Sequence, residues 1–397
     1  MSAVKRSGWS IPAPNQIVSF GIPLAHALPE ALGKLAMKNV AVVTTNSLAG
    51  EGGLAEELTK ILGPRLHSVT AGVKPHTPRA SALRVANAIK GADGVVTIGG
   101  GSVHDTVKAA RLFLANDIQR TDDVDRFTPL YKVANPGYKL DLMEAEDANP
   151  PTLPFVAIPT TLSAGEFTPG VGVTDERGPI KQVFVYPRLA PDMVILDPEM
   201  TRQTPPRLFF ASGMRAVDHA VESWCSINAT ALSEACSLHA ARLLILGLRE
   251  AFSNPDDMQA RLDCQQGAWL SIRGGSSGVK SGASHGFGHA LGGTAGMLHG
   301  DTSCVMLPHV LRYNASVNAE RQAAIAAAVG QPGTPLAEII ASLVAHLGLP
   351  GRLRDAGVAE DLLDKVAAAT THDSCMKNNP LPIESQEEAR RVLQEAW

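Results

Sequence analysis

The character of the chain changes near Asp197-Pro198, and this change constrains the fold more than any other feature of the sequence. Before this point, short runs rich in valine and isoleucine alternate with segments of helical periodicity. Beyond it, long helical patterns rich in alanine and leucine take over. Strands that alternate with helices predict a mostly parallel sheet covered on both faces. We therefore predict an α/β domain followed by an all-helical domain.

The expected elements define these two domains. Expected strands cover residues 39–45, 65–71, 94–98, 154–159 and 193–196, and expected helices cover 53–62, 79–90, 102–115, 231–252, 257–273, 319–329 and 335–347. Residues 116–151 are polar and irregular, which indicates an inserted excursion that contains loops. We place the domains at residues 1–197 and 198–397, and the pattern allows a boundary anywhere from about residue 170 to 200.

Composition excludes several classes of partner. A chain of 397 residues with 45% hydrophobic residues can bury the cores of two domains. The formal net charge of -4, without blocks of like charge, argues against nucleic acid or an anionic membrane as the main partner. No segment approaches the ~20 apolar residues of a membrane span. We expect a protein that acts on a small molecule and binds neither a membrane nor nucleic acid.

The cysteines and the amino-terminal residues indicate a compartment. The five cysteines form no C-x-x-C pair, and their odd number is not a disulfide framework. We expect reduced thiols in a reducing compartment. Lys5 and Arg6 are not followed by an apolar run, so no signal peptide is expected. These features together predict a soluble cytoplasmic enzyme.

Three glycines follow the predicted strand at residues 94–98. In Gly99-Gly100-Gly101-Ser102, the absence of side chains lets the backbone approach a ligand closely, and the next helix directs unpaired N–H groups at the loop. This arrangement suits a pyrophosphate, although the spacing is neither G-x-G-x-x-G nor a P-loop. A tight turn with Ser102 as the helix N-cap explains the same residues. The sequence alone leaves both interpretations open.

A second polar loop follows the predicted strand at residues 154–159. Its hydroxyl groups belong to Thr160, Thr161 and Ser163. They lie at the carboxyl end of a parallel strand, where open α/β sheets bind their ligands. A serine- and threonine-rich turn without a ligand is the alternative.

Histidines gather in a short part of the second domain. His285, His289 and His299 fall within fifteen residues flanked by glycines, and His219 lies on an earlier helical segment. Because His285 and His289 are four residues apart, they share one face of a helix. Clustered imidazoles suit a divalent transition metal or proton transfer near neutral pH. A lone buried histidine is usually structural, but this density favours a functional site.

These motifs, in this order, resemble the iron-containing alcohol dehydrogenase superfamily. The pattern comprises G-G-G-S-x-x-D-x-x-K, I-P-T-T, D-P, the helix with His219, H-x-x-x-H-x9-H-G, and then residues 305–309 and 312–314, and the resemblance covers about residues 16–397. It implies a Rossmann-like dinucleotide-binding domain and a helical domain in a dehydroquinate synthase-like architecture. It also implies an active site in the cleft between the domains, and a homodimer.

The resemblance assigns roles to individual residues. Residues that contact NADH or NADPH are implied at the two loops and at one further lysine: Gly99, Gly100, Gly101, Ser102, Thr160, Thr161, Ser163 and Lys181. His219, His285 and His299 match the positions that bind Fe2+ or Zn2+. His289 matches the histidine beside the nicotinamide that is given a role in proton transfer.

One position departs from the family pattern. The fourth metal ligand of the family is an aspartate four residues before the first ligand histidine, and here that residue is Arg215. A guanidinium is always positively charged, so it repels a cation and cannot bind one. Asp218 points ~100° away from His219 on a helix, and we expect it to pair with Arg215 at i, i+3. The chain is more similar to the maleylacetate reductase-like branch, as Gly292-Gly293 and Asn378-Asn379-Pro380 before a last short helix also indicate.

This departure predicts a chemistry. Hydride transfer leaves negative charge on an oxygen, which Arg215 together with His219 and His285 can stabilise, while His289 supplies a proton. Arg215 can equally bind a substrate carboxylate in a bidentate manner. We expect an NAD(P)-dependent reductase of an oxo acid or conjugated carbonyl, similar to maleylacetate reductase.

Two alternatives and the choice of nucleotide stay open at this point. One alternative is an alcohol or aldehyde dehydrogenase that holds Fe2+ or Zn2+ through three histidines and water. The other is a regulatory or binding protein that keeps only the fold, and intact loops and histidines argue against it. Thr45 is the last residue of the expected strand at 39–45, and the resemblance implies that relatives preferring NAD often carry an aspartate at this position. Without that carboxylate the site could bind NADPH as well as NADH.

Overall fold

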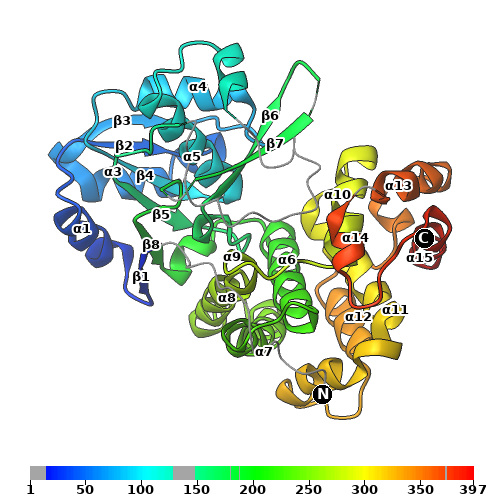
Figure 1. The fold of residues 1–397 in the computed structure, drawn as a ribbon. Coiled ribbons are helices and arrows are strands. Elements are labelled where there is room, and N and C mark those ends of the chain that lie inside the picture. Colours follow the sequence, from blue (N-terminus) through cyan, green and yellow to red (C-terminus); the bar gives the residue numbers. More distant parts are fainter. Residues whose placement is uncertain (1–14, 128–147, 179, 187, 372) are drawn as a thin grey trace. The chain divides into compact units, whose positions relative to one another are not determined.

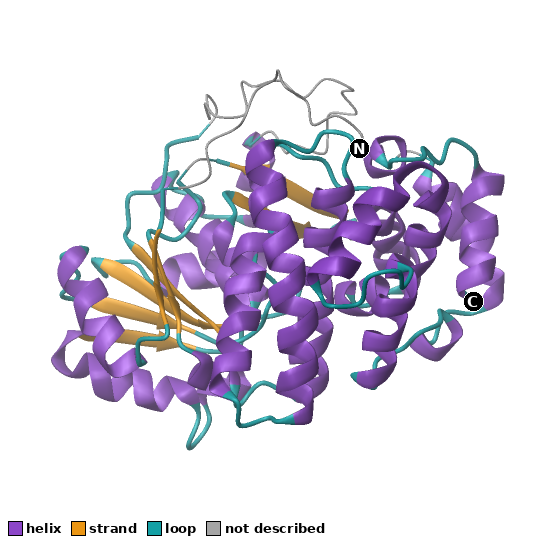
Figure 2. Ribbon diagram, turned by 90° about the horizontal axis from the view of Figure 1, so that it is seen from below, coloured by secondary structure: helices purple, strands orange, loops and turns teal. Residues whose placement is uncertain are grey.

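The computed structural model describes residues 15–127, 148–178, 180–186, 188–371 and 373–397. The chain divides into two compact units, one spanning Ala13–Thr204 and the other consisting chiefly of Pro205–Trp397. In Figure 1 the first unit runs from blue to green and the second from green to red. Figure 2 distinguishes strands, helices and loops by colour. By their residue numbers, all described strands belong to the first unit, while the described part of the second is built of helices and loops. The predicted α/β and all-helical classes are confirmed.

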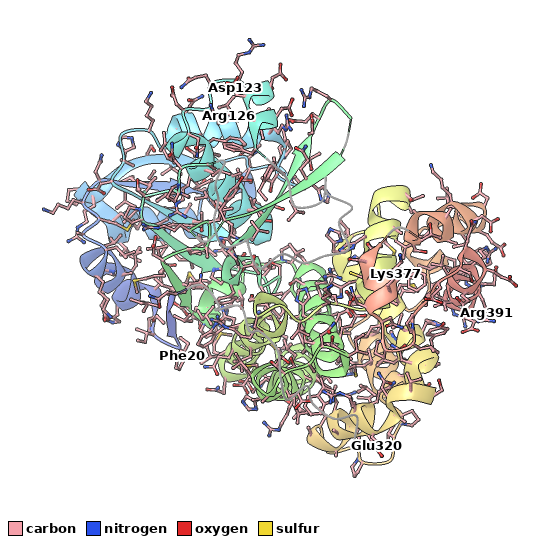
Figure 3. The ribbon with its side chains drawn as sticks, in the orientation of Figure 1. Phe20, Asp123, Arg126, Glu320, Lys377 and Arg391 are labelled. Atoms are coloured by element: carbon pink, nitrogen blue, oxygen red, sulfur yellow. The ribbon has the colours of Figure 1, made fainter. Side chains whose placement is uncertain are left out.

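A six-stranded parallel sheet forms the framework of the first unit. Its order is β1-β8-β5-β4-β2-β3, and every hydrogen-bonded pair in it is parallel. The strands are β1 Ile17–Phe20, β2 Val40–Val43, β3 Leu66–Thr70, β4 Gly94–Gly99, β5 Phe155–Pro159 and β8 Met193–Leu196. Five of them match predicted strands. The edge strand β1 was not predicted, and its Phe20, labelled in Figure 3, is half exposed.

Helices cover both faces of this sheet. They are α1 Leu24–Lys34, α2 Asn46–Ala49, α3 Leu54–Leu62, α4 Arg79–Ala88 and α5 Gly101–Ala115. Leu28 of α1 and Leu58 of α3 are buried in one core with Val96 and Ile158, which point to the same face of the sheet. On the opposite face, His104 of α5 bonds to Thr97 of β4 through Nδ1 and Oγ1, which are 2.8 Å apart.

An antiparallel hairpin lies outside the main sheet. Its strands are β6 Gly170–Asp175 and β7 Ile180–Val185, and neither was predicted. The buried ammonium of Lys108 in α5 donates to the carbonyl of Gly170, so α5 holds the start of this hairpin. Of the predicted excursion, residues 128–147 lie outside the described part, and Thr121–Arg126 forms a 3-10 helix. Beyond Asp197 the unit continues through another 3-10 helix, Pro198–Thr201.

The second unit is a helical assembly. Its helices are α6 Pro206–Cys225, α7 Ala231–Ser253, α8 Met258–Ser271, α9 Arg273–Ser276, α10 Ala283–Ala295, α11 His299–Ala328, α12 Leu336–His346, α13 Leu363–Thr370, α14 Ser374–Asn378 and α15 Gln386–Ala396. The predicted helix at residues 319–329 is only the last part of α11. That helix begins at His299, runs through Pro308 and has a non-helical residue at Asn318. A core that includes Phe287, Val305, Val366 and Leu393 joins α10, α11, α13 and α15.

Helix α7 is long and apolar enough to cross a membrane by length and composition alone. From the sequence we expected no segment of this length and composition, and α7 is an exception to that expectation. It packs against α8, where a Cβ atom at Gly267 would lie 2.7 Å from Leu244. Buried core helices of soluble proteins pass the same test, so a single such helix is weak evidence for a membrane span.

Candidate functional site

The glycine loop joins β4 directly to α5. Gly99 has a φ of +153°, which side chains rarely adopt, and a Cβ atom there would lie 2.7 Å from Cγ2 of Val103. The N-cap of α5 is Gly100, which offers no side chain to the first turn. The alternative in which Ser102 caps the helix is therefore wrong, because Ser102 lies inside the helix. The amino end of a fifteen-residue helix is left open to an anion.

The second predicted loop packs against the first. The amide of Thr160 donates to the carbonyl of Gly99 over 2.9 Å. A Cβ atom at Gly100 would lie 3.1 Å from the Thr161 side chain, and one at Gly101 would lie 2.8 Å from Oγ of Ser163. The structure thus brings both loops to the carboxyl ends of the adjacent strands β4 and β5. Open α/β sheets bind nucleotides at such an edge.

Two other predicted cofactor residues lie at different places in this unit. Thr45 is the N-cap of α2 just beyond β2, and its Oγ1 lies 2.9 Å from Oγ of Ser47. Since β2 is the neighbour of β4 in the sheet, Thr45 lies at the same edge as the glycine loop. Lys181 lies on β7, and its side chain is outside the described part of the chain.

A buried lysine behind the two loops was not recognised as functional in the sequence. Lys108 is fully buried, and its ammonium donates to the carbonyl of Gly165 and pairs with Asp105 over 3.2 Å. It therefore holds the end of the second loop against α5. The D-x-x-K spacing after the glycines was its signal in the sequence.

The four predicted histidines lie on three helices of the second unit. His219 is on α6, His285 and His289 are on α10, and His299 is the first residue of α11. The rings of His219 and His285 have centroids 5.0 Å apart. A Cβ atom at Gly292 would lie 3.5 Å from the ring of His299, which places this third ring beside α10. Nδ1 of His219 and Nε2 of His285 are buried and have no hydrogen-bond partner.

The rings of His219 and His285 carry no charge near neutral pH. Burial, followed by the positive charge of Arg215, lowers the pKa of His285 to about 3. The same two causes, in the same order, lower the pKa of His219 well below its ordinary value. The positive charge in this cluster is therefore the guanidinium of Arg215.

Arg215 is held in place by its neighbours. Its Nη1 lies 3.5 Å from Oδ2 of Asp218 and 3.3 Å from Oγ of Ser303, and its side chain is 14% exposed. The predicted i, i+3 pair of Arg215 and Asp218 is confirmed. Asp218 is completely buried and also accepts from the hydroxyls of Ser284 and Ser303. Its Oδ2 is thus occupied by hydrogen bonds, while its buried Oδ1 has no hydrogen-bond partner. Asp218, Glu222 and His285 together offer three possible ligand atoms within 4.8 Å of one another.

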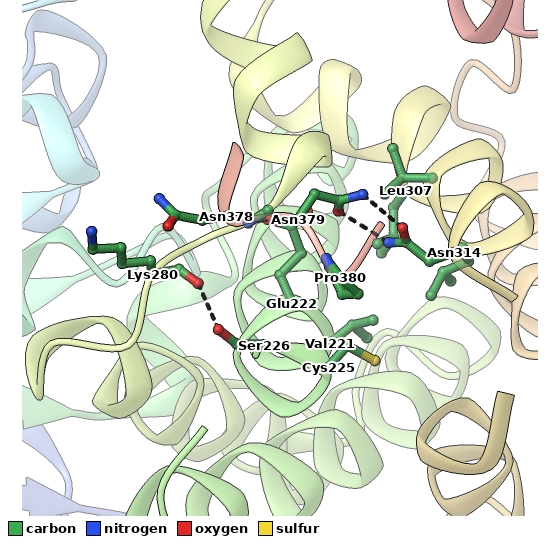
Figure 4. Close-up of a pocket in the computed structure, with 13 residues that line it drawn as sticks. Val221, Glu222, Cys225, Ser226, Lys280, Leu307, Asn314, Asn378, Asn379 and Pro380 are labelled. Atoms are coloured by element: carbon green, nitrogen blue, oxygen red, sulfur yellow. Dashed lines mark hydrogen bonds between the residues drawn. The ribbon is translucent and has the colours of Figure 1, made fainter. Parts of the chain in front are cut away.

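Glu222, one turn after His219 on α6, was missed in the sequence. Its Oε2 lies 2.7 Å from Nδ1 of His285, and its carboxylate also accepts from the amides of Gly282 and Ser284 at the start of α10. Burial raises the pKa of Glu222 to about 7. Figure 4 shows it beside Asn379 and Asn314, which bond to one another. Glu222 therefore fixes both the amino end of α10 and the ring of His285.

Asp373 is a second residue that the sequence did not reveal. Its Oδ2 lies 2.7 Å from Nδ1 of His289, the half-exposed histidine of the cluster. Its Oδ1 accepts from the amide of Cys375 over 2.8 Å, which makes it the N-cap of α14. An aspartate before a short helix signals a cap in the sequence. Nothing in its spacing connects it with a histidine 84 residues away.

The glycine loop at the edge of a parallel sheet and the histidine cluster of the helical unit define a class of protein, the nicotinamide-dependent oxidoreductases. Comparison with known proteins identifies the family. Residues 14–198 match the family described as iron-containing alcohol dehydrogenase, and residues 209–397 match the Fe-containing alcohol dehydrogenase family, C-terminal. The chain belongs to the iron-containing alcohol dehydrogenase family.

Individual relatives agree with this assignment. Dehydrogenase FUM7 of Gibberella moniliformis is 31% identical over 410 residues, with 92% of this chain and 93% of that protein covered. The NAD-dependent methanol dehydrogenase of Bacillus methanolicus is 28% identical, with 86% of this chain and 88% of that protein covered. The crystal structure of maleylacetate reductase from Agrobacterium tumefaciens has a TM-score of 0.81 at 26% identity and covers 98% of each chain.

The family usually uses iron, and the residues of this cluster fit such an ion only in part. Nδ1 of His219 and Nε2 of His285 are available as ligands. The fourth ligand position holds the guanidinium of Arg215, whose charge is close enough to lower the pKa of both imidazoles. A cation beside it would be repelled. The four-ligand set of the family is therefore absent, and no step of the chemistry below passes through a metal.

Proposed function

We propose that this chain reduces an oxo acid or a conjugated carbonyl acid with NADH or NADPH, and that Arg215 takes the place of the metal of the family. The observation that carries the proposal is the position of Arg215 within the histidine cluster, bonded to Asp218 and Ser303. The similarity to a maleylacetate reductase structure over 98% of both chains supports the class of substrate.

The proposed chemistry follows from the charges of the cluster. When hydride leaves the nicotinamide for an electron-poor carbon, negative charge develops on the carbonyl or enolate oxygen. A preorganised positive group stabilises that charge most where water is excluded. Arg215 supplies this group or binds the substrate carboxylate, since its planar fork suits two parallel hydrogen bonds. His219 and His285 are neutral, so they add hydrogen-bonding capacity but no charge.

A metal-dependent alcohol or aldehyde dehydrogenase is the second candidate. The two unpartnered imidazole nitrogens, on His219 and His285, favour it. With His299 they give three nitrogen ligands, and water would complete the set. The two candidates differ in a property that can be measured directly, which is whether the activity needs a metal.

Metal analysis separates these candidates. The purified protein is analysed for iron and zinc by mass spectrometry, and NADH oxidation is then measured before and after treatment with a chelator. We expect metal far below one ion per chain and unchanged activity after chelation. One tightly held ion per chain, together with activity that is lost on chelation and restored by Fe2+ or Zn2+, would reject the first candidate and establish the second.

A substrate screen tests the chemical class. NADH and NADPH oxidation is followed with maleylacetate, simple 2-oxo acids and unsubstituted aldehydes of matched length. We expect the highest kcat/KM for substrates that carry a carboxylate, because Arg215 binds that group. A preference for aldehydes without a carboxylate would contradict the proposal. Oxidation of neither nucleotide with any of these compounds would instead favour a chain that keeps the fold without the activity.

The nucleotide, the compartment and the assembly are part of the same proposal. Thr45 at the end of β2 carries no charge to repel a 2′-phosphate, which supports the use of NADPH as well as NADH. The five cysteines are unpaired, which supports a reducing compartment such as the cytoplasm. The homodimer implied by the resemblance stays a prediction.

A further inference from the structure

The geometry points to Asp373 as a positioning residue that fixes the tautomer and orientation of His289, so that Nε2 of His289 exchanges the substrate proton. This inference rests on the proposed function, because it assigns the proton transfer of that reaction. It arises from one contact that no spacing in the sequence reveals, the 2.7 Å between Nδ1 of His289 and Oδ2 of Asp373.

The direction of this hydrogen bond follows from the state of the carboxyl group. Burial alone would raise the pKa of Asp373, but the hydrogen bond and charge of His289, together with the bond from the Cys375 amide, outweigh it and lower that pKa. An ionised carboxylate only accepts hydrogen bonds. Nδ1 of His289 must therefore carry the hydrogen, which leaves Nε2 as the atom that gains or loses a proton.

The carboxylate is itself fixed by the fold. Its other oxygen, Oδ1, caps α14 through the amide of Cys375, so Asp373 cannot rotate without opening that helix. The side chain of Asp373 is 19% exposed, whereas that of His289 is 39% exposed. The carboxylate is thus shielded while the imidazole keeps a path to solvent. A shielded carboxylate behind a more exposed imidazole is the arrangement by which proteins orient a general acid or base.

His289 and Asp373 together account for the proton that the reduction consumes. A bound nicotinamide would supply the hydride, its C–H bond breaking as the new bond to the carbonyl carbon forms, and the carbonyl oxygen would then need one proton. The oxygen takes the proton from Nε2 of the His289 imidazolium, whose charge Asp373 stabilises. His289 is left neutral with its hydrogen on Nδ1, and solvent returns the proton to Nε2. Oxidation of the product runs through the same atoms in reverse.

A metal site at the same place is the competing interpretation. His289, Asp373 and Cys375 offer three ligand atoms within 4.8 Å of one another. Burial raises the pKa of the Cys375 thiol well above its ordinary value, so a metal at this place would have to displace the thiol proton. Nδ1 of His289 already donates to Asp373. A metal at this place would have to displace that hydrogen.

The test uses Asp373→Asn. This substitution keeps the cap of α14 but changes which ring nitrogen of His289 carries the hydrogen. The amide oxygen of asparagine can still cap α14, but its NH2 group then faces Nδ1 of His289 and moves the hydrogen to Nε2. We expect kcat to fall by about 100-fold or more, the range that general acid–base catalysis supplies, with KM almost unchanged. His289→Gln should cost about as much, and adding Asp373→Asn to it should cost nothing further.

Asp257→Asn is the matched control, because Asp257 also caps a helix with one carboxylate oxygen, accepting from the amide of Ala260 at the start of α8. It should leave kcat unchanged. An Asp373→Asn protein with undiminished kcat, or losses in kcat that multiply in the double variant, would overturn the inference.

A measurement without substrate tests the role of Asp373 separately from the proposed function. Nitrogen-15 NMR of the imidazoles, with His289→Gln to identify the signal, should show hydrogen on Nδ1 in the parent and on Nε2 in Asp373→Asn. This result is expected even if no carbonyl substrate is found. Hydrogen on Nε2 in the parent protein would contradict the inference. So would binding of added Zn2+ that is abolished by Cys375→Ser and by His289→Gln.

Discussion

Gly99 and Val103 lie so close that no side chain fits between them. A Cβ atom at position 99 would lie 2.7 Å from Cγ2 of Val103, a buried residue on the first turn of α5. Because φ at Gly99 is also +153°, an alanine there would be strained both by its backbone conformation and by its contact with Val103. We predict that Gly99→Ala lowers the free energy of unfolding by about 1–3 kcal/mol and weakens NADH binding. Urea unfolding and a fluorescence titration with NADH measure the two effects.

Gly33→Ala provides the control for this substitution. Nothing lies within 4 Å of a Cβ atom at Gly33, near the end of α1 in the same unit. It should leave NADH binding unchanged and stabilise the protein slightly, because alanine favours a helix. Equal effects of the two substitutions on NADH binding would show that the loop does not depend on the space at Gly99.

The charge of Arg215 should determine both the rate of reduction and the binding of metal. We expect Arg215→Met to lower kcat/KM by about 100- to 1000-fold, as removal of a donor to a developing oxyanion does in other enzymes. Arg215→Lys keeps the charge without the planar fork, so its loss should be smaller. Arg215→Asp restores the ligand of the family and should retain Fe2+ or Zn2+ after purification, as mass spectrometry of the protein would show.

Arg207→Met is the matched control for these three variants. Arg207 lies on the first turn of the same helix and pairs with Asp301 over 2.9 Å, but it is 58% exposed. Its loss should change kcat/KM little. An Arg215→Met protein as active as Arg207→Met would exclude Arg215 from the reaction.

Thr45→Asp should change the choice of nucleotide. A carboxylate at the end of β2 holds a ribose diol and repels a 2′-phosphate. We expect the Kd of NADPH to rise by about 5-fold or more relative to that of NADH, since two like charges in contact cost ~1 kcal/mol or more. Thr45→Asn has nearly the same shape without the charge and should leave the ratio unchanged. A constant ratio in both variants would place the 2′-phosphate elsewhere.

His104 should make the stability of the protein depend on pH. Burial first, and then the charge of Lys108, lower its pKa from the ordinary 6.5 to about 3. Between these two pH values the unfolded chain binds a proton that the folded chain excludes, so stability falls as pH decreases from 6.5 towards 3. The contribution of this group is about 1.4 kcal/mol for each pH unit in that window.

The comparison of the parent with His104→Gln isolates this contribution. Thermal unfolding of both proteins at pH 7 and pH 5 gives the change in midpoint for each. The parent should lose more stability than His104→Gln on acidification. Parallel losses would mean that His104 titrates normally in the folded protein.

The sequence predicted the elements whose periodicity is strong and uninterrupted. The strand at residues 94–98 and the helix at 102–115 are examples, because a buried strand and an amphipathic helix each have a distinct repeat. Strand β1, Ile17–Phe20, was missed because it has only four residues and is partly exposed. Helix α11 was shortened because Pro308 ordinarily ends a helix, yet here the helix continues through it.

The candidate site likewise contains residues that the sequence could predict and residues that only the structure reveals. Residues whose positions follow from local spacing, such as His285 and His289 or Arg215 and Asp218, could be predicted from the sequence. The structure also brings Gly101 and Ser163 together, a contact between the two loops that the sequence had not indicated. Asp373 could not be found in this way, because its contact with α10 depends on tertiary packing between distant segments.

Four residues of the site, Arg215, Asp218, His219 and Glu222, occupy successive turns of the single helix α6. Besides its contact with Arg215, Asp218 accepts from two serines on α10 and α11, and Glu222 accepts from the amides at the start of α10. These hydrogen bonds tie α6 to its neighbours through atoms other than those of residue 215. The sign of the charge within the histidine cluster can therefore be exchanged at one position while the helix stays where it is. In an evolving family, such a helix permits a change of electrophile without a change of scaffold.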